Sequence, residues 1–264
     1  MNLKRALACA VDAAKEVGDL MRRNLRETKA INEQSQFDIK LQLDVRSQEL
    51  ITKRLMGAFP DTSIYGEEGV SGKQDSEWRW VVDPIDGTVN FTYGIPHACV
   101  SIALQQKKGA EYVTQAGVVY DPFTDELFTA IRGDAAKLNG KPIRASKRSE
   151  LGQAIIAIGF AKKRESLMEN LPVFNNLVKQ VRKMRIMGAA AISLVWVAAG
   201  RFDAYVESGV SLWDVAAGAL IIECAGGEFY FEPLEGDAVR MIANNGLLRK
   251  KIQRVIKASK RLKV

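Results

Sequence analysis

Two carboxylates stand three residues apart in the segment Trp80-Val81-Val82-Asp83-Pro84-Ile85-Asp86-Gly87-Thr88-Val89-Asn90-Phe91, directly after an apolar run typical of a buried strand. Unpaired carboxylates at such a position are costly or lose their charge, so Asp83 and Asp86 need a partner. Hard divalent cations such as Mg²⁺ are suitable partners because they take oxygen ligands and retain positions for water and phosphate. The alternative is a tight turn with two solvated aspartates, since Asp, Pro and Gly are common turn residues.

Further acids occur at the edges of other apolar segments. Asp44 stands at the start of a predicted helix, Glu67 follows Ser63-Ile64-Tyr65-Gly66, and Asp214 follows Leu212-Trp213. If these acids converge on Asp83 and Asp86, each pair of charges at about 4 Å repels by roughly 4 kcal/mol at an effective dielectric constant of about 20. Bound cations would offset this repulsion, and two divalent ions bridged by one acid suit displacement at phosphorus.

Gly87 and Thr88 add an element for binding an anion. If a helix begins here, the backbone N–H groups of these two residues lie at its N-terminus, where unpaired donors and the helix dipole favour a phosphate. The Thr88 hydroxyl could then orient an attacking water, with an acid such as Asp44 accepting the hydroxyl proton. The expected site therefore combines a metal with a phosphate cradle.

Helices and short strands alternate around these residues. Apolar residues at spacings of three and four predict helices, and runs rich in β-branched and aromatic residues between turn signals predict strands. The helices are predicted at 3–27, 44–58, 167–181, 189–199 and 214–225, and the strands at 63–65, 78–82, 99–104, 113–120, 126–131 and 154–160, with a hairpin turn at 105–109. This order predicts an α/β fold with helices on both sides of mixed sheets.

The chain of 264 residues is long enough for one large unit or two closely joined lobes around a sizeable core. Polar residues interrupt the strand pattern near 147–152. We therefore expect an N-terminal lobe, 1–146, with most of the metal ligands, and a C-terminal lobe, 147–264, with Asp214 and the substrate-side residues. The two lobes are expected to form a single compact unit.

The composition excludes several other classes of protein. The three cysteines, Cys9, Cys99 and Cys224, are far apart in apolar sequence, which favours reduced thiols over a disulfide framework. A single histidine, His97, argues against a His-ligated zinc site and against a Ser-His-Asp hydrolase. The N-terminus has no signal-type apolar segment, and no apolar run approaches the roughly 20 residues that span a bilayer. We expect a cytoplasmic protein without a membrane segment.

The net charge of +7 is concentrated at the C-terminus, where residues 249–264 contain eight Lys or Arg and no acid. Ile252, Val255, Ile256 and Leu262 recur there at roughly helical spacing, which favours a surface helix with one docked stripe and a solvated cationic face. The alternative is a site for an anionic partner such as RNA.

Several motifs together resemble those of the inositol monophosphatases. They are Gly66-Glu67-Glu68, the segment from Trp80 to Phe91, Gly117-Val118-Val119-Tyr120-Asp121-Pro122, Leu138-Asn139-Gly140, and Trp213-Asp214-Val215-Ala216-Ala217-Gly218 with Ala225-Gly226-Gly227. The resemblance covers nearly the whole chain. It implies a layered α-β-α-β-α sandwich of the inositol monophosphatase and fructose-1,6-bisphosphatase type, a homodimer, and inhibition by lithium.

The resemblance also implies roles for individual residues. Glu67, Asp83 and the Ile85 carbonyl would hold one Mg²⁺, and Asp83, Asp86 and Asp214 a second, with a weaker third near Glu67. Thr88 and Asp44 match the pair that positions the nucleophilic water, and Gly87 and Thr88 match the phosphate-binding amides. The substrate side matches Asp86, Glu207 and the loop Gly188-Ala189-Ala190.

Departures from the family pattern bear on the substrate. Asp38-Ile39-Lys40-Leu41-Gln42-Leu43-Asp44 keeps both acids of the usual motif but not its threonine, and Ala189 stands where threonine or serine is common. The resemblance implies a Mg²⁺-dependent phosphate monoester hydrolase acting on a small phosphorylated polyol or sugar, with inositol 1-phosphate as the first candidate. The alternatives are fructose 1,6-bisphosphate, 3′-phosphoadenosine 5′-phosphate and histidinol phosphate, or a regulator that binds RNA or the transcription machinery.

Overall fold

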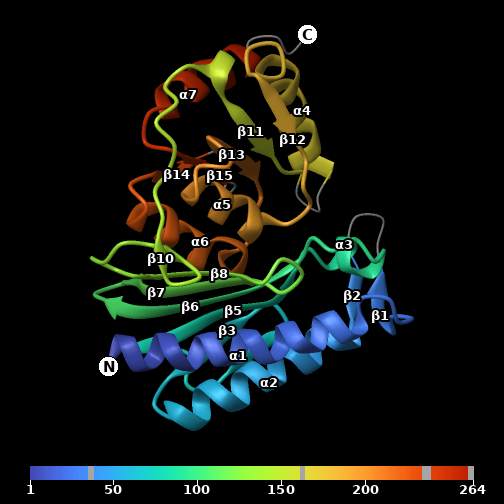
Figure 1. Ribbon diagram of the computed structural model, residues 1–264, viewed down its shortest axis with the longest axis vertical. Helices are drawn as coiled ribbons and strands as arrows, with labels where there is room; N and C mark the ends of the chain where they lie inside the picture. Colours follow the sequence, from blue (N-terminus) through green and yellow to red (C-terminus); the bar gives the residue numbers. More distant parts are fainter. Residues whose placement is uncertain (35–38, 161–163, 234–238, 261–264) are drawn as a thin grey trace.

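Two β-sheets separate three layers of helices in the computed structural model, which describes residues 1–34, 39–160, 164–233 and 239–260 (Figure 1). The outer pair α1 (Leu3–Asn24) and α2 (Gln42–Ala58) covers one face of an eight-stranded sheet. The helices α5 (Ala190–Ala198) and α6 (Leu212–Cys224) lie between the sheets, and α4 (Arg164–Leu177) and α7 (Arg249–Lys260) cover the far face of a five-stranded sheet. The predicted α-β-α-β-α sandwich is confirmed.

The larger sheet has the strand order β10-β9-β8-β7-β6-β5-β3-β4 and the smaller one β12-β11-β13-β15-β14, while β1 and β2 pair separately. The strands of the larger sheet are β3 (Ser63–Gly66), β4 (Gly69–Ser71), β5 (Trp78–Asp86), β6 (Cys99–Lys108), β7 (Glu111–Asp121), β8 (Glu126–Ile131), β9 (Lys137–Leu138) and β10 (Lys141–Pro142). The remaining strands are β1 (Ile31–Gln34), β2 (Ile39–Leu41), β11 (Ile155–Ile158), β12 (Lys183–Arg185), β13 (Ala204–Ser208), β14 (Glu228–Pro233) and β15 (Val239–Asn244). The short helix α3 (Thr88–Thr92) follows β5, and a 3₁₀ turn, Leu151–Gln153, precedes β11.

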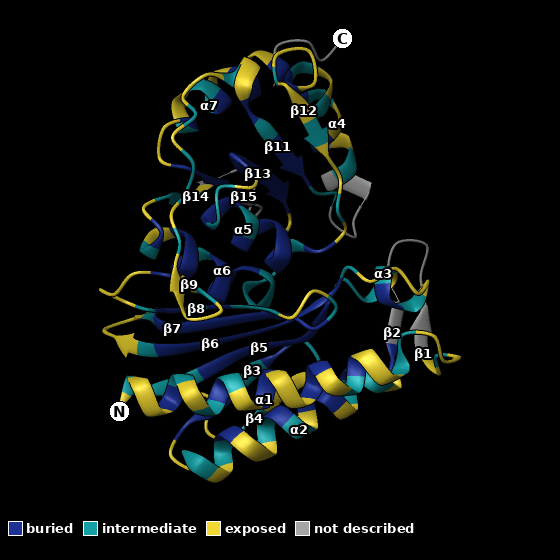
Figure 2. Cartoon of the chain, in the orientation of Figure 1, coloured by how far each residue is buried: buried dark blue, intermediate teal, exposed yellow. Residues whose placement is uncertain are grey.

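Both faces of the larger sheet are apolar because helices cover each of them. Along β5, Trp80 and Val82 pack toward α1 and α2, whereas Val81 packs toward α5 and α6. This alternation follows from the two-residue period of a strand and explains why the sequence reads as a continuous apolar run. Figure 2 shows α5 and α6 largely buried between the sheets, while α1 and α2 each keep an exposed face.

The helix α1 forms because small apolar residues recur on one side of it. Ala6, Ala10, Val17 and Met21 are buried at helical spacing against the sheet. The Asn2 side chain caps the first turn by accepting a hydrogen bond of 3.0 Å from the Arg5 amide. The helix ends at residue 24, slightly earlier than the predicted 27.

Parts of the secondary structure differ from the prediction. The residues 105–108, expected in a hairpin turn, continue β6, and the turn itself consists of Gly109 and Ala110, with Gly109 at a φ of 64°. The lysines are compatible with a strand because this end of the hairpin is exposed, whereas Gln105 is buried and donates through Nε2 to the Thr114 hydroxyl at 3.1 Å. The strands β13, β14 and β15 were not predicted. The expectations for Asp38 and Leu262 fall outside the described residues.

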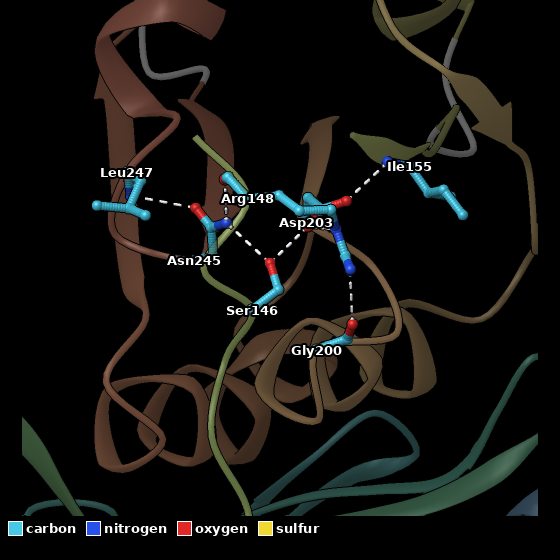
Figure 3. A network of polar contacts seen from close by, with 7 residues as sticks. All are labelled: Ser146, Arg148, Ile155, Gly200, Asp203, Asn245 and Leu247. Atoms are coloured by element: carbon cyan, nitrogen blue, oxygen red, sulfur yellow. Dashed lines mark hydrogen bonds and ion pairs between the residues drawn. The ribbon is translucent and has the colours of Figure 1, made fainter. Parts of the chain in front are cut away.

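A polar network fastens the segment between the two sheets to the smaller sheet (Figure 3). Asp203, which is completely buried, accepts hydrogen bonds from the Ser146 hydroxyl (2.5 Å), Arg148 Nε (2.7 Å) and the Ile155 amide (2.7 Å). Asn245 Nδ2 donates to Ser146 Oγ and to the Arg148 carbonyl, at 2.9 and 2.8 Å. Because a buried carboxylate is stable only with such donors, the network fixes this crossing of the chain. The division at residues 146 and 147 stays a prediction.

The cysteines in the described part of the chain are free thiols, in agreement with the expectation from their spacing. No helix among the described residues is both long enough and apolar enough to cross a membrane.

Candidate active site

A cavity of about 430 Å³ lies between the two sheets. The end of β5 and α3 form one wall, and the end of β11, the 186–190 loop, β13 and the start of α6 form the other. The cavity brings together all the predicted site residues except Asp44: Glu67, Asp83, Ile85, Asp86, Gly87, Thr88, Gly188, Ala189, Ala190, Glu207 and Asp214.

An irregularity in β5 places Asp83 and Asp86 on the same cavity. Asp83 pairs with Ser101 and Asp86 pairs with Cys99, so three steps along β5 oppose two steps along β6. Residues three apart in a regular strand face opposite sides, and one extra residue restores the same side. Pro84 lies inside this bulge, where its missing N–H breaks no ladder hydrogen bond.

Backbone amides hold both carboxylates in place. Asp83 Oδ1 accepts from the Ile85 amide at 3.1 Å. Ala190 and Ala191 are the first residues of α5. Their amides donate to Asp86 Oδ1 and Oδ2 at 3.0 and 2.8 Å. A carboxylate at a helix N-terminus gains both from free N–H groups and from the helix dipole. Burial outweighs these donors and raises the pKa of Asp86 to about 6, with a further contribution from the charge of Glu67.

Asp214 faces Asp86 from the first turn of α6. Its Oδ2 accepts a hydrogen bond of 2.7 Å from the Ser211 amide at the start of that helix. Burial, followed by the charges of Asp86, Glu67 and Glu207, raises the pKa of Asp214 to about 8. No Lys or Arg of the described residues lines the cavity, so ionising both of these buried acids together is costly unless a cation binds.

This donor set fits hard divalent cations. Carboxylate and carbonyl oxygens are the ligands that Mg²⁺ takes, and a cation would stabilise the ionised forms that burial disfavours. Among the described residues, no three acidic, histidine or cysteine side chains are already gathered as a closed ligand cluster. Asp83, Asp86 and Asp214 each accept a hydrogen bond from a backbone amide, and a carboxylate oxygen with one such bond retains a further lone pair for a metal.

Gly87 makes the sharp turn from β5 into α3. Its φ of 91° is in the left-handed region, and a Cβ at this position would lie 2.9 Å from the His97 carbonyl oxygen. Only glycine fits both conditions. The turn brings Thr88 into the cavity, where its hydroxyl donates to the Ile85 carbonyl at 2.9 Å.

Asp44 lies outside the cavity lining. It occupies the first turn of α2, is 3% exposed, and accepts a hydrogen bond of 2.8 Å from the Leu41 amide through Oδ2. This contact gives Asp44 a role at the start of α2. Its predicted partnership with Thr88 stays a prediction.

Two residues that line the cavity were missed in the sequence. Tyr205 lines the cavity two residues before Glu207, and its hydroxyl donates to the Glu207 carboxylate. Asn90 donates through Nδ2 to the carbonyls of His97 and Met187, at 3.0 and 2.9 Å, and so ties α3 to the loop before α5. A predicted strand at 204–208 would have revealed Tyr205, because residues two apart share a face.

Comparison with known proteins identifies the family. Residues 2–260 match the model of the inositol monophosphatase family. The chain belongs to this family. Inositol monophosphatase 1 of Solanum lycopersicum is 40% identical over 236 residues, covering 87% of this chain and 85% of the relative. A protein named Nus factor SuhB in Pasteurella multocida is also 40% identical, over 84% of this chain and 83% of its own length.

Solved structures of family members share the fold. The inositol monophosphatase from Anabaena superposes with a TM-score of 0.85 at 35% identity, covering 98% of this chain and 97% of its own. The extragenic suppressor protein SuhB of Bartonella henselae gives 0.87 at 34% identity, covering 95% and 98%. The family therefore includes proteins named for a phosphatase activity and proteins named for another role.

Proposed function

We propose that the protein is a Mg²⁺-dependent phosphate monoester hydrolase. The observation that carries this proposal is the pair Asp86 and Asp214, held on opposite walls of one cavity with pKa values raised to about 6 and about 8. Such a pair favours bound cations, and membership of the inositol monophosphatase family supports a phosphatase. When bound in this cavity, Mg²⁺ would neutralise charge at the phosphoryl group and activate water.

Most of the metal- and phosphate-binding roles in this proposal belong to residues of the first wall, with Asp214 added from the opposite one. Glu67, Asp83 and the Ile85 carbonyl would hold one cation, and Asp83, Asp86 and Asp214 would hold a second, with a weaker third near Glu67. The Gly87 and Thr88 amides bind the phosphate, and the Thr88 hydroxyl, with Asp44, orients the attacking water. The water oxygen gives up one proton and bonds to phosphorus, the bond from phosphorus to the alcohol oxygen breaks, and the alcohol oxygen takes up one proton as it leaves.

Residues of the second wall select the alcohol. Glu207 lines the cavity and is 8% exposed, and in this proposal it accepts a hydrogen bond from a substrate hydroxyl, while Gly188, Ala189 and Ala190 leave space for the ring. Inositol 1-phosphate is the first candidate substrate. Fructose 1,6-bisphosphate, 3′-phosphoadenosine 5′-phosphate and histidinol phosphate are the alternatives.

The test is phosphate release from these four substrates, measured with Mg²⁺ and with EDTA. We expect Mg²⁺-dependent turnover with the highest kcat/KM for inositol 1-phosphate. If kcat/KM is highest for 3′-phosphoadenosine 5′-phosphate, that nucleotide replaces inositol 1-phosphate as the substrate. Absence of Mg²⁺-dependent phosphate release from all four compounds would refute the proposed function. The homodimer is tested by light scattering of the purified protein.

A second candidate function is binding to RNA, and it is favoured by the relatives named Nus factor SuhB and by the helix α7. One side of α7 is docked in the core, since Ile252 and Ile256 have no exposed surface. Arg249 pairs with Glu228 and Lys251 with Glu150, at 3.0 and 2.7 Å. Truncation of this helix would therefore unfold part of the core, so charge reversal is the suitable test.

Among the α7 side chains whose exposure the structure describes, the exposed cations are Lys250, Arg254 and Lys257. Their replacement by glutamate should abolish any salt-sensitive RNA binding while phosphatase activity remains. The control replaces Lys4, Lys15 and Lys53, which are exposed on α1 and α2 at the opposite end of the molecule (Figure 1). Absence of RNA binding by the unmodified protein would remove this candidate.

A further inference from the structure

The Glu207 carboxylate is held by a neighbour on its own strand. Tyr205 and Glu207 are two residues apart on β13, so both side chains project from one face into the cavity. The two side chains are 3% and 8% exposed, and the Tyr205 hydroxyl donates to Glu207 Oε2. Among the described residues, no protein group donates to Oε1. One oxygen of the carboxylate is thus occupied and the other remains available as an acceptor.

The backbone of Gly159 packs directly against the Glu207 carboxylate. A Cβ at this position would lie 2.2 Å from Glu207 Cδ and Oε2, so the space is filled by the carboxylate and is open only because residue 159 is glycine. The backbone of Gly159 is itself fixed. Its amide donates to the Val206 carbonyl at 3.0 Å, and its carbonyl accepts from Asn170 Nδ2 at 3.0 Å.

A buried chain of polar groups supports this wall from behind. Asn170 has no exposed surface and accepts at Oδ1 from the Ser208 hydroxyl at 3.0 Å. The Ser208 hydroxyl in turn accepts from Arg240 Nε at 3.2 Å. Satisfied polar groups in a low dielectric hold a defined geometry, because breaking any one contact leaves a buried group unpaired. The wall that holds Glu207 is therefore preorganised.

We propose that Tyr205 is a positioning residue that, together with Gly159, fixes Glu207 so that a single oxygen, Oε1, accepts a hydrogen bond from a hydroxyl of the departing alcohol. This inference rests on the proposed function and concerns its substrate class: a phosphate monoester of a polyol rather than of a simple alcohol. Sites built to bind a substrate hydroxyl discriminate against analogues that lack it, because the acceptor is then left unpaired.

The experiment compares two substrates with the same ring size, inositol 1-phosphate and cyclohexyl phosphate, which has no hydroxyl. Tyr205→Phe keeps the ring and removes the donor, and Gly159→Ala displaces the same carboxylate while Tyr205 remains. For both variants we expect kcat/KM for inositol 1-phosphate to fall about 10-fold, mainly through KM, with cyclohexyl phosphate unchanged. Tyr120→Phe is the matched control, since its hydroxyl donates to Asp125 away from the cavity.

The outcomes separate this inference from the proposed function. If both variants lose kcat/KM equally on the two substrates, or lose it on neither, the Tyr205 contact is only structural and the inference is overturned. Equal use of the two substrates by the unmodified protein would also overturn it and leave the phosphatase standing. If thermal melting shows that Tyr205→Phe is unfolded, Gly159→Ala decides alone. Hydrolysis of neither substrate would overturn the inference, whereas the proposed function falls only if fructose 1,6-bisphosphate, 3′-phosphoadenosine 5′-phosphate and histidinol phosphate are also not hydrolysed.

Discussion

The metal-free protein is expected to lose stability as the pH rises from 6 to 8. Burial raises the pKa of Asp86 to about 6, of Glu207 to about 7 and of Asp214 to about 8. A carboxyl whose pKa is higher in the folded than in the unfolded chain binds its proton more tightly when folded. Folding is therefore favoured below this pH range, and the stabilisation is lost as the pH rises through the folded pKa values.

The size of the loss follows from the protons that the folded protein retains. One proton retained over one pH unit is worth about 1.4 kcal/mol. Between pH 6 and 8, Asp214 retains its proton over most of the range, Glu207 over half of it and Asp86 over little. The combined decrease in the free energy of unfolding is on the order of 4 kcal/mol, which lowers the melting temperature by roughly 10 °C in a chain of this length.

The assay is thermal melting in EDTA at pH 6, 7 and 8. Asp214→Asn removes the largest contribution. Between pH 6 and 8, the melting temperature of this variant should therefore fall by less than half as much as that of the unmodified protein. Asp75→Asn, at a side chain that is 66% exposed, should show the full decrease. Saturating Mg²⁺ at pH 8 should restore the melting temperature of the unmodified protein, since a ligand of the folded state stabilises it. Equal slopes for the unmodified protein and Asp214→Asn would refute the reasoning.

Three substitutions test the first wall of the cavity. Asp86→Asn should lower kcat by several orders of magnitude with an unchanged circular dichroism spectrum, and normal turnover would contradict its metal-binding role. Thr88→Val should lower kcat roughly 100-fold while Thr88→Ser retains most activity, and equal rates for the two variants would exclude a role for the hydroxyl. Gly87→Ala should lower the free energy of unfolding by about 1–3 kcal/mol, because its φ of 91° and the His97 carbonyl at 2.9 Å leave no place for a Cβ. An unchanged denaturant midpoint would contradict that account.

The layered fold and the family were predictable because motifs such as Trp80 to Phe91 and Trp213 to Gly218 resemble those of the inositol monophosphatases, while the apolar pattern predicted many of the helices and strands. The alternating burial of Trp80, Val81 and Val82 follows from a sheet covered on both faces, which an apolar run with turn signals at its ends indicates. The strand β13 was missed because it has only five residues and two of them, Glu207 and Ser208, are polar. Both are buried, so the usual alternation of apolar and polar residues does not mark the strand. Its position depends on pairing with β11 and β15, which are distant in the sequence.

The site was only partly predictable. The acid positions at strand and helix ends predicted a shared cavity, but the bulge that turns Asp83 and Asp86 to one side depends on the register with β6. Tyr205 was missed together with its strand. The placement of Asp44 away from the cavity depends on how α2 packs, which no local pattern encodes. The roles of the individual residues in catalysis stay predictions.

The two walls of the cavity belong to different sheets, and this separates two properties of the protein. The acids Asp83 and Asp86 come from the larger sheet, whereas Tyr205 and Glu207 come from the smaller one. Substitutions on β13 can therefore exchange one alcohol for another while Asp83 and Asp86 on β5 remain undisturbed. Duplicated genes with this architecture can diverge in substrate and keep one hydrolytic chemistry, and the same division makes β13 the natural target for directed evolution.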